Sequence, residues 1–340
     1  MKLRDFAAAI GLAPGTVSRA LNGYAGVSAG TRARVLAEAE RLGYRPDRLG
    51  RMLRTGRSET IGVLLSPPQG GFNNPFFVDW LEGIDRALAA TPFTMIVTAA
   101  HSAADEMARL ARLTATIGVE GVLFARTRRE DPRIAFLERE GVPFATLGRT
   151  AATCPHPWVD IDHAVVGREA ALRLAARGHR RIALLNTAEE LMYSRHAMDG
   201  FREGLRQAGL DPRAAPVLHD APTEAGGEAA MRALLARPGP RPTALLCGND
   251  LMAAGAMRAL AAAGLRAGAD MAVIGCNDHP MCTMLDPPLT SFTAPVGHAG
   301  ERCARLLLDL LGGAAPVAEL IAPRLVARAS DPPLAELRAA

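Results

Sequence analysis

The sequence predicts two kinds of structure in one chain: a small N-terminal all-α head with a helix-turn-helix, and a larger α/β body built from parallel strands. Apolar residues recur at helical spacing over residues 3–54, and positive charge is concentrated in the same stretch. From Thr60 onward, short apolar runs alternate with helical patterns. A chain of 340 residues is long enough for a small head and a body of two packed sub-domains.

The first two helices of the head are joined through Gly11, which permits a sharp turn. Pro14 opens the second helix at a position where its missing N–H costs nothing. The apolar stripe comprises Leu3, Phe6, Ala7 and Ile10 in the first helix and Val17, Ala20 and Leu21 in the second. The second helix then presents a polar, cationic face of major-groove width, which consists of Gly15, Thr16, Ser18, Arg19 and Asn22.

A third helix is expected after Ser28, a typical N-cap residue, and it ends at Gly43. Its predicted buried stripe is Val35, Leu36, Ala39 and Leu42. Three helices of this length can close one small core. A plain three-helix bundle is the alternative, but it does not need serine, threonine and arginine in this fixed pattern.

The head resembles the LacI/GalR family of bacterial transcription regulators. The resemblance rests on Thr16-Val17-Ser18-Arg19, Asn22, Val27-Ser28, Thr31-Arg32 and Leu42-Gly43-Tyr44-x-Pro46. It implies a DNA-binding domain over residues 1–45 whose partner is double-stranded operator DNA. The contacts that it implies come from Arg4, Gly15, Thr16, Ser18, Arg19, Asn22, Ser28, Thr31 and Tyr44.

Residues 46–58 are expected to form a hinge helix and linker. Leu49, Met52 and Leu53 lie among arginines in a segment too short for a stable helix in water, so it should fold only on a surface. In the family that the chain resembles, this helix enters the minor groove and a leucine at the position of Leu53 wedges between base pairs. A charged linker is the alternative interpretation.

Charge and cysteine usage limit the class of protein. Residues 1–60 carry eleven lysines and arginines against five acids, a net charge of +6, whereas the whole chain carries +4. The positive charge is therefore local, as expected of a polyphosphate-binding module on a nearly neutral body. The five cysteines are scattered without a Cys-x-x-Cys pair, and no signal sequence or apolar run of about twenty residues occurs. These features predict a cytoplasmic protein with free thiols and no membrane partner.

Seven apolar runs in the body read as buried parallel strands: 61–65, 94–98, 119–124, 144–147, 182–185, 244–247 and 271–274. One continuous sheet is possible on this pattern alone. The body also resembles the two-lobed, periplasmic-binding-protein-like body of the same family, through Asn74-Pro75-Phe76-Phe77, Gly178-His179-Arg180-Arg181-Ile182, Asn249-Asp250-x-Met252-Ala253 and Pro288-Leu289-Thr290. The resemblance implies an effector-binding and dimerisation body over residues 59–330. Its first lobe covers about 59–161 and 292–318, its second about 162–291 and 319–330, and a tail follows at 331–340.

A cleft for a small molecule is expected beyond the C-terminal ends of the strands. Polar, charged and aromatic residues are expected to line this cleft: Asn74, Phe76, Phe77, Asp162, Arg195, Asn249, Asp250, Asn277 and Asp278. Carboxylates and amides can bond neighbouring hydroxyls, and an aromatic ring can cover the apolar face of a sugar. For each residue alone, capping or turn formation is an equally good interpretation; Asn249-Asp250, for example, can cap the next helix.

The chain departs from the family pattern in the recognition helix and in the cleft. Pro14 and Gly15 stand where the family usually has residues that contact DNA, so direct base readout falls mainly on Arg19. The family's sugar-gripping arginine would fall at Ala197, and Arg195 or His196 are the candidates to replace it. The segments around residues 147–150 and 159–162 look closest to a branch that responds to α-glucosides.

These features together predict a homodimeric transcriptional regulator that represses carbohydrate genes and is controlled by a sugar-like effector. Neither a cofactor nor a metal site is expected, because the sequence has no complete metal, phosphate-loop or nucleophile motif. A sugar-binding protein and a sugar-modifying enzyme are the alternatives. The first has no need of a +6 head, and the second requires an acid/base pair or a metal that the sequence does not offer.

Overall fold

The computed structural model describes residues 1–21, 23–44, 57–66 and 75–337. The chain divides into two compact units, Met1–Glu59 and Thr60–Ala340. Residues 46–56 of the expected hinge helix and linker, including Leu53, lie outside the described residues, as do Asn22 and Asn74.

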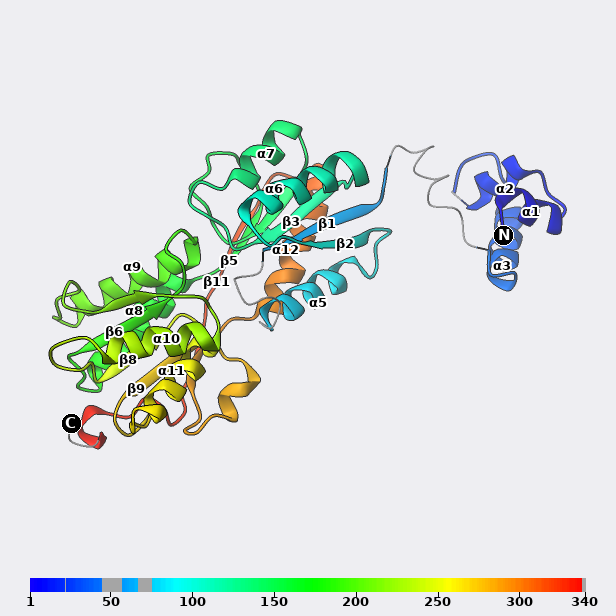
Figure 1. Cartoon of the computed structure of the whole chain (residues 1–340). Coiled ribbons are helices and arrows are strands. Elements are labelled where there is room, and N and C mark those ends of the chain that lie inside the picture. The colour runs from blue at the N-terminus through cyan, green and yellow to red at the C-terminus, as the bar shows by residue number, and fades with distance from the viewer. Residues whose placement is uncertain (22, 45–56, 67–74, 338–340) are drawn as a thin grey trace. The chain divides into compact units, whose positions relative to one another are not determined.

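The head contains the three predicted helices, which are α1 (Leu3–Ala9), α2 (Pro14–Leu21) and α3 (Ala29–Arg41) (Figure 1). Their core is built on Phe6, Val17 and Val35, each fully buried. Leu36 was expected in the buried stripe of α3, but it is 50% exposed. That prediction is wrong because Val35 and Ala39, four residues apart, already fill the face of α3 that meets the other helices.

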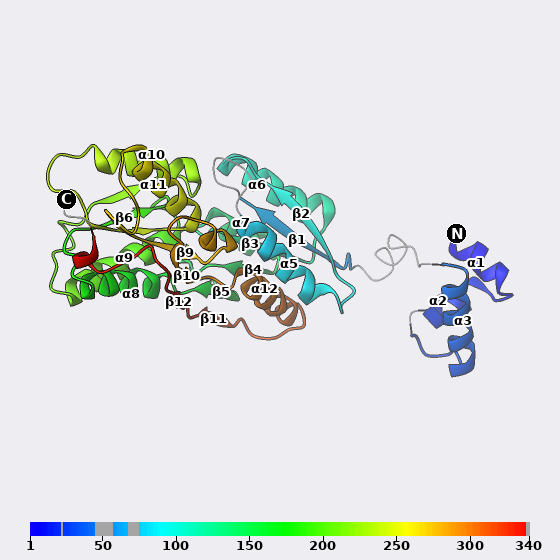
Figure 2. The ribbon, with the colours of Figure 1, turned by 90° about the horizontal axis from the view of Figure 1, so that it is seen from below.

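The first lobe of the body is a six-stranded parallel sheet in the order β11-β5-β4-β3-β1-β2. Its strands are β1 (Thr60–Leu65), β2 (Thr94–Ala99), β3 (Gly121–Ala125), β4 (Phe144–Leu147), β5 (Trp158–Ile161) and β11 (Ala318–Ile321). One face is covered by α5 (Phe76–Leu88) and α12 (Val296–Leu311), which lie side by side (Figure 2). The other face is covered by α6 (Ala103–Ala111), a π-helical segment (Arg112–Ile117) and α7 (Pro132–Glu140).

The second lobe has a sheet in the order β12-β10-β9-β8-β6-β7, parallel except for the antiparallel edge strand β12. Its strands are β6 (Ile182–Asn186), β7 (Val217–His219), β8 (Ala244–Cys247), β9 (Ala272–Asn277), β10 (Thr290–Thr293) and β12 (Leu325–Val326). Helices α8 (His163–Ala176) and α9 (Met192–Gln207) cover one face, and α10 (Glu224–Leu235) and α11 (Asp250–Ala262) cover the other.

All seven predicted apolar runs contain strands, and their side chains alternate between two cores. In β1, Ile61 and Val63 pack toward α5 and α12, whereas Leu64 packs toward α6 and α7. Burial on both faces explains why these strands read as continuous apolar runs. The strands that were not predicted are short or partly exposed, such as β7 and β11.

The chain crosses between the lobes three times, at residue 162, after β10 and after β11. The crossings expected near residues 291 and 319 come a few residues later in the structure. β10 stays in the second sheet because it pairs with β9 as far as Thr293. β11 stays in the first sheet because it pairs with β5 as far as Ile321. Each strand continues for as long as its neighbour offers hydrogen-bonding partners.

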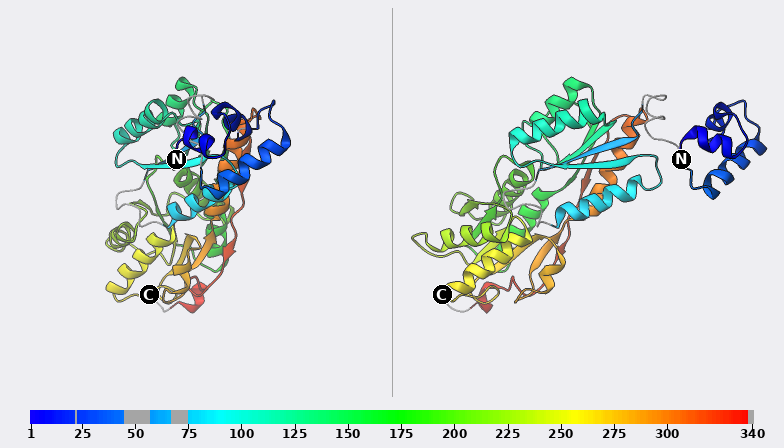
Figure 3. Two further views of the ribbon diagram at one scale, coloured as in Figure 1. Left: turned by 90° about the vertical axis from the view of Figure 1, so that its right-hand side faces the viewer. Right: turned by 45° about the vertical axis from the view of Figure 1, so that its right-hand side comes forward.

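The segment expected to form a tail from residue 331 begins with a fully buried residue, Asp331. The Asp331 carboxylate accepts hydrogen bonds from Arg173 Nε at 2.5 Å and from the Thr290 hydroxyl at 2.6 Å. His179, also fully buried, lies 3.1 Å from the carbonyl oxygen of Pro332. Buried hydrogen bonds therefore hold the C-terminal segment against the second lobe. Figure 3 shows this segment in red beside that lobe.

We expect Asp331→Ala to lower the free energy of unfolding by about 3 kcal/mol, because it leaves charged partners inside the second lobe unpaired. Urea unfolding of the full chain measures the change. Glu336→Ala, at an exposed position in the same segment, is the control and should stay within about 0.5 kcal/mol of the wild type. If Asp331→Ala were as stable as Glu336→Ala, the C-terminal segment would not stabilise the second lobe.

Candidate functional site

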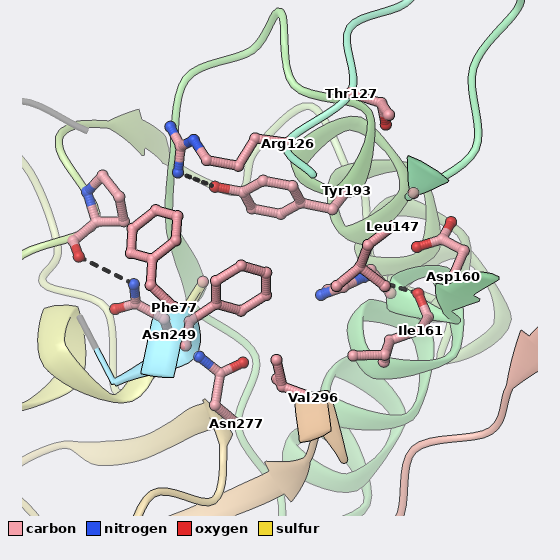
Figure 4. A pocket seen from close by; sticks show the side chains of 15 residues that line it. Phe77, Arg126, Thr127, Leu147, Asp160, Ile161, Tyr193, Asn249, Asn277 and Val296 are labelled. Carbon is pink, nitrogen blue, oxygen red and sulfur yellow. Dashed lines mark hydrogen bonds between the residues drawn. The ribbon is translucent and has the colours of Figure 1, made fainter. Parts of the chain in front are cut away.

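A cavity lies between the two lobes, where the C-terminal ends of their parallel strands face each other (Figure 4). Four of the residues predicted for the cleft line it: Phe76, Phe77, Asn249 and Asn277. The two phenylalanines begin α5 and pack edge to face with their ring centres 5.5 Å apart. Asn277 ends β9 with a φ of 114°, a left-handed backbone that asparagine tolerates better than most residues. These residues supply an apolar wall and two amides.

Asp162 and Arg195 are not among the residues that line this cavity in the described part of the chain. The Asp162 carboxylate caps α8, where it accepts a hydrogen bond from the backbone N–H of Ala164 at 3.2 Å. Asn249 combines both roles, because its amide oxygen caps α11 by accepting from Met252 N–H at 2.7 Å while the residue also lines the cavity. The capping interpretation of these strand-end residues therefore holds alongside the binding one.

Asp250 and Asp278 are held by protein groups beside the cavity. Asp250 is 2% exposed, and its two oxygens accept hydrogen bonds from the Ser291 hydroxyl at 2.6 Å and the His279 backbone N–H at 2.8 Å. The Asp278 carboxylate pairs with Arg328 at 2.7 Å. Both line a neighbouring cavity that borders the first at Asn249 and Asn277. Their role in the structure is to hold loops of the second lobe in place.

Five polar residues that were not predicted from the sequence also line the cavity: Arg126, Thr127, Asp160, His163 and Tyr193. Asp160 is on β5, a strand that was not predicted, and it accepts a hydrogen bond from Arg149 Nε at 2.7 Å. Tyr193 opens α9, and its ring centre lies 5.5 Å from that of His163. Val159, Asp160 and Ile161 alternate between apolar and polar, which is typical of a strand. If this segment had been predicted as a strand, Asp160 would have been a candidate for the cleft. No local signal distinguishes Arg126.

Two histidines at or behind the cavity wall, His163 and His196, have a pKa below the ordinary value. Burial lowers the pKa of His163. Burial, followed by the positive charge of Arg149, lowers the pKa of His196. Arg149 Nη2 lies 3.2 Å from His196 Nδ1, so the imidazole can accept a hydrogen bond from the guanidinium. His196 thus supports Arg149 behind the cavity wall.

The candidate DNA-binding residues lie on the head. Arg4, Gly15 and Arg19 are exposed, whereas Thr16 and Ser18 are half-buried. Ser28 caps α3 by accepting from the Thr31 backbone N–H at 3.2 Å, and the two hydroxyls lie 2.9 Å apart. Arg19 Nε donates to the Gly15 carbonyl at 3.3 Å, along the exposed side of α2.

Tyr44, also predicted to bind DNA, is 6% exposed. Its ring stacks on Phe6 with the centres 4.2 Å apart and the planes 6° from parallel. The ring is therefore part of the core of the head. The backbone N–H of Tyr44 donates to the Ala39 carbonyl at 2.8 Å, in the turn that follows α3.

Two family models match the chain: "Bacterial regulatory proteins, lacI family" over residues 2–47 and "Periplasmic binding protein-like domain" over residues 171–330. The chain is 37% identical to the HTH-type transcriptional regulator AglR of Rhizobium meliloti (strain 1021), over 98% of this chain and 95% of that protein. It is 35% identical to the HTH-type transcriptional regulator CelR of Thermobifida fusca, over 96% of this chain and 97% of that protein.

Solved structures are similar over both units. A transcriptional regulator CelR–cellobiose complex matches with a TM-score of 0.74 and 33% identity, over 97% of this chain and 99% of that chain. The lac repressor dimer bound to operator and the anti-inducer ONPF matches with a TM-score of 0.84 and 27% identity, over 97% and 98%. In the described part of the chain, no helix is both long and apolar enough to span a membrane. The same residues hold no group of three or more His, Cys, Asp or Glu side chains arranged to bind a metal ion.

Burial raises the pKa of Asp250 to about 6, although the hydrogen bonds from Ser291 and His279 oppose the rise. Between pH about 4 and about 6 the folded state therefore binds this proton more tightly than the unfolded state does, so the contribution of Asp250 to stability falls as pH rises through that window. We expect the unfolding free energy of the wild type, minus that of Asp250→Asn, to fall by up to about 3 kcal/mol across it.

Urea unfolding of both proteins at pH values from 4 to 7 measures this difference. It should level off above the raised pKa, where the carboxylate is ionised in both states. A difference that stays constant over the whole range would show that Asp250 titrates normally.

Proposed function

Since the chain belongs to the LacI family of bacterial regulatory proteins, we propose that this DNA-binding transcription regulator acts as a homodimeric repressor of carbohydrate-metabolism genes. In this proposal a small, neutral sugar binds between the lobes and changes operator affinity. The observation that carries it is the cavity itself, which combines two phenylalanine rings with amide, carboxylate, guanidinium and phenol groups. Operator binding implies that the regulator acts in the cytoplasm, where bacterial DNA is.

The cleft is suited to binding rather than to turnover. A glycoside hydrolase uses two carboxyl groups on opposite sides of the bond that it breaks. Among the described residues that line the cavity, Asp160 is the carboxylate, and it is ion-paired with Arg149 at 2.7 Å. A carboxylate held in this way can orient a sugar hydroxyl as an acceptor. We therefore propose that the protein is not an enzyme.

The family resemblance to sugar-responsive relatives supports the class of effector. One matched solved structure is a complex with cellobiose. In this proposal the protein binds its operator as a two-fold dimer, because one small head reads only a half-site. The effector of this chain, in our proposal, is a neutral saccharide held by Asn249, Asn277, Asp160 and Arg126.

Binding of a sugar should raise the melting temperature of the full chain. A ligand at one hundred times its dissociation constant adds about 2.7 kcal/mol to stability. A thermal-shift screen of neutral sugars and sugar phosphates, followed by electrophoretic mobility shift on DNA upstream of the gene with and without each hit, tests the proposal. A sugar that stabilises the protein but never alters a specific DNA complex would favour a sugar-binding protein without regulatory function, and product formation would favour an enzyme.

Arg19 is expected to read a base. If its guanidinium forks onto guanine O6 and N7, Arg19→Ala should cost about 1–3 kcal/mol in operator binding and relax the preference at one position of each half-site. Titration of operators with single substitutions at every position measures both effects. A uniform loss on operator and scrambled DNA alike would mean that Arg19 contacts only phosphate.

A further inference from the structure

A second cavity, which we call the side cavity, shares the residue Arg126 with the cleft between the lobes. The polar residues around the side cavity, besides Arg126, are Ser66, His101, Ser102, Glu106, Arg128 and Glu190. Both lobes contribute, because Glu190 belongs to the second lobe and the others to the first. The lobes meet here through the backbone N–H of Met192, which donates to the Thr127 carbonyl at 2.9 Å.

The backbone of Arg126 is held firmly, whereas its guanidinium is held weakly. The residue has a φ of 57°, in the left-handed region that a non-glycine residue adopts at some energetic cost. Its carbonyl accepts a hydrogen bond from the fully buried Arg133 at 3.1 Å, which stabilises this conformation. Its Nη1 donates to the Tyr193 hydroxyl at 3.4 Å, a long hydrogen bond (Figure 4). A ligand hydroxyl can replace that phenol without disturbing the backbone.

Two arginines and two glutamates line the side cavity: Arg126, Arg128, Glu106 and Glu190. Glu106 also lies 3.6 Å from the buried Arg133, whose charge is matched by Asp131 at 2.6 Å, so the positive and negative charges are equal in number. Glu106 is 2% exposed and pairs with Arg128 at 2.8 Å. A phosphate would gain no net positive potential here, whereas a neutral molecule rich in hydroxyls finds both donors and acceptors. The lining therefore favours a saccharide over a sugar phosphate.

We propose that the side cavity is a second subsite, which holds one ring of a disaccharide or longer linear sugar whose other ring occupies the cleft. This inference rests on the proposed function and specifies the effector further. Arg126 lies between the two rings and donates to hydroxyls of both, because a guanidinium carries five N–H donors in a fixed plane. It takes the role that the sequence suggested for Arg195.

The test uses a substitution that fills part of the side cavity and leaves the residues of the cleft unchanged. Ala103, in the first turn of α6, lines the side cavity, whereas its neighbour Ala104 is exposed and does not. Calorimetric titration of the full chain with maltose, trehalose, cellobiose, melibiose, lactose and glucose compares wild type, Ala103→Phe and the matched control Ala104→Phe. We expect the wild type to bind at least one disaccharide tenfold or more tightly than glucose. Ala103→Phe should abolish that advantage and leave glucose affinity unchanged, and Ala104→Phe should behave as wild type.

Thermal unfolding and operator binding without sugar verify that Ala103→Phe is folded. If it is not, Glu190→Ala, an exposed residue of the second lobe, takes its place and should weaken the disaccharide selectively. Equal affinities for the disaccharide in wild type and in the folded narrowing variant would overturn the subsite. A wild type that prefers glucose would also overturn it but leave the proposed function intact. A wild type that binds none of these sugars and none in the wider screen would overturn the effector class, and the subsite with it.

Discussion

The geometry of the cleft depends on one buried guanidinium, that of Arg133. It is fully buried, donates twice to Asp131 at 2.8 and 2.6 Å, and lies over the Phe124 ring at 4.4 Å. Burial by itself raises the pKa of Asp131, but the hydrogen bonds and charge of Arg133 outweigh burial and hold that pKa below its ordinary value. The remaining donors reach Ser66 at the end of β1 and the carbonyls of residues 125 and 126 at the end of β3. Two strand ends are thereby fixed where the lobes meet.

A second constraint is that strand-end polar residues must satisfy helix N-termini before they can serve a ligand. The strands β3, β5 and β8 each lead into a helix whose first N–H groups need acceptors. Asp131 and Asp162 meet that need for α7 and α8, and Asn249 does so for α11. Asn249 also lines the cavity, while Asp162 does not. Two N-cap residues that both follow parallel strands thus differ in whether they also line the cavity.

The two units divide the chemistry between them. Residues 1–60 carry a net charge of +6, whereas the body encloses a cavity lined by one arginine, Arg126, and one carboxylate, Asp160, which pairs with Arg149. Long-range attraction to a polyanion is therefore a property of the head alone, and selectivity for a neutral ligand is a property of the body. Coupling between them requires a ligand that prefers one arrangement of the two lobes.

The helices of the head, seven strands of the body and the family could be predicted from the sequence, because apolar periodicity, caps and a contiguous motif are local properties. The same is true of Phe76, Phe77, Asn249 and Asn277 as cavity residues, which follow or lie at the ends of recognisable elements. Only the tertiary structure decided that Tyr44 is buried in the core, that Asp331 is an anchor, and that Arg126 rather than Arg195 faces the cavity. Those assignments depend on contacts between residues far apart in the chain, such as Arg126 with Tyr193. No spacing pattern within one segment encodes such contacts.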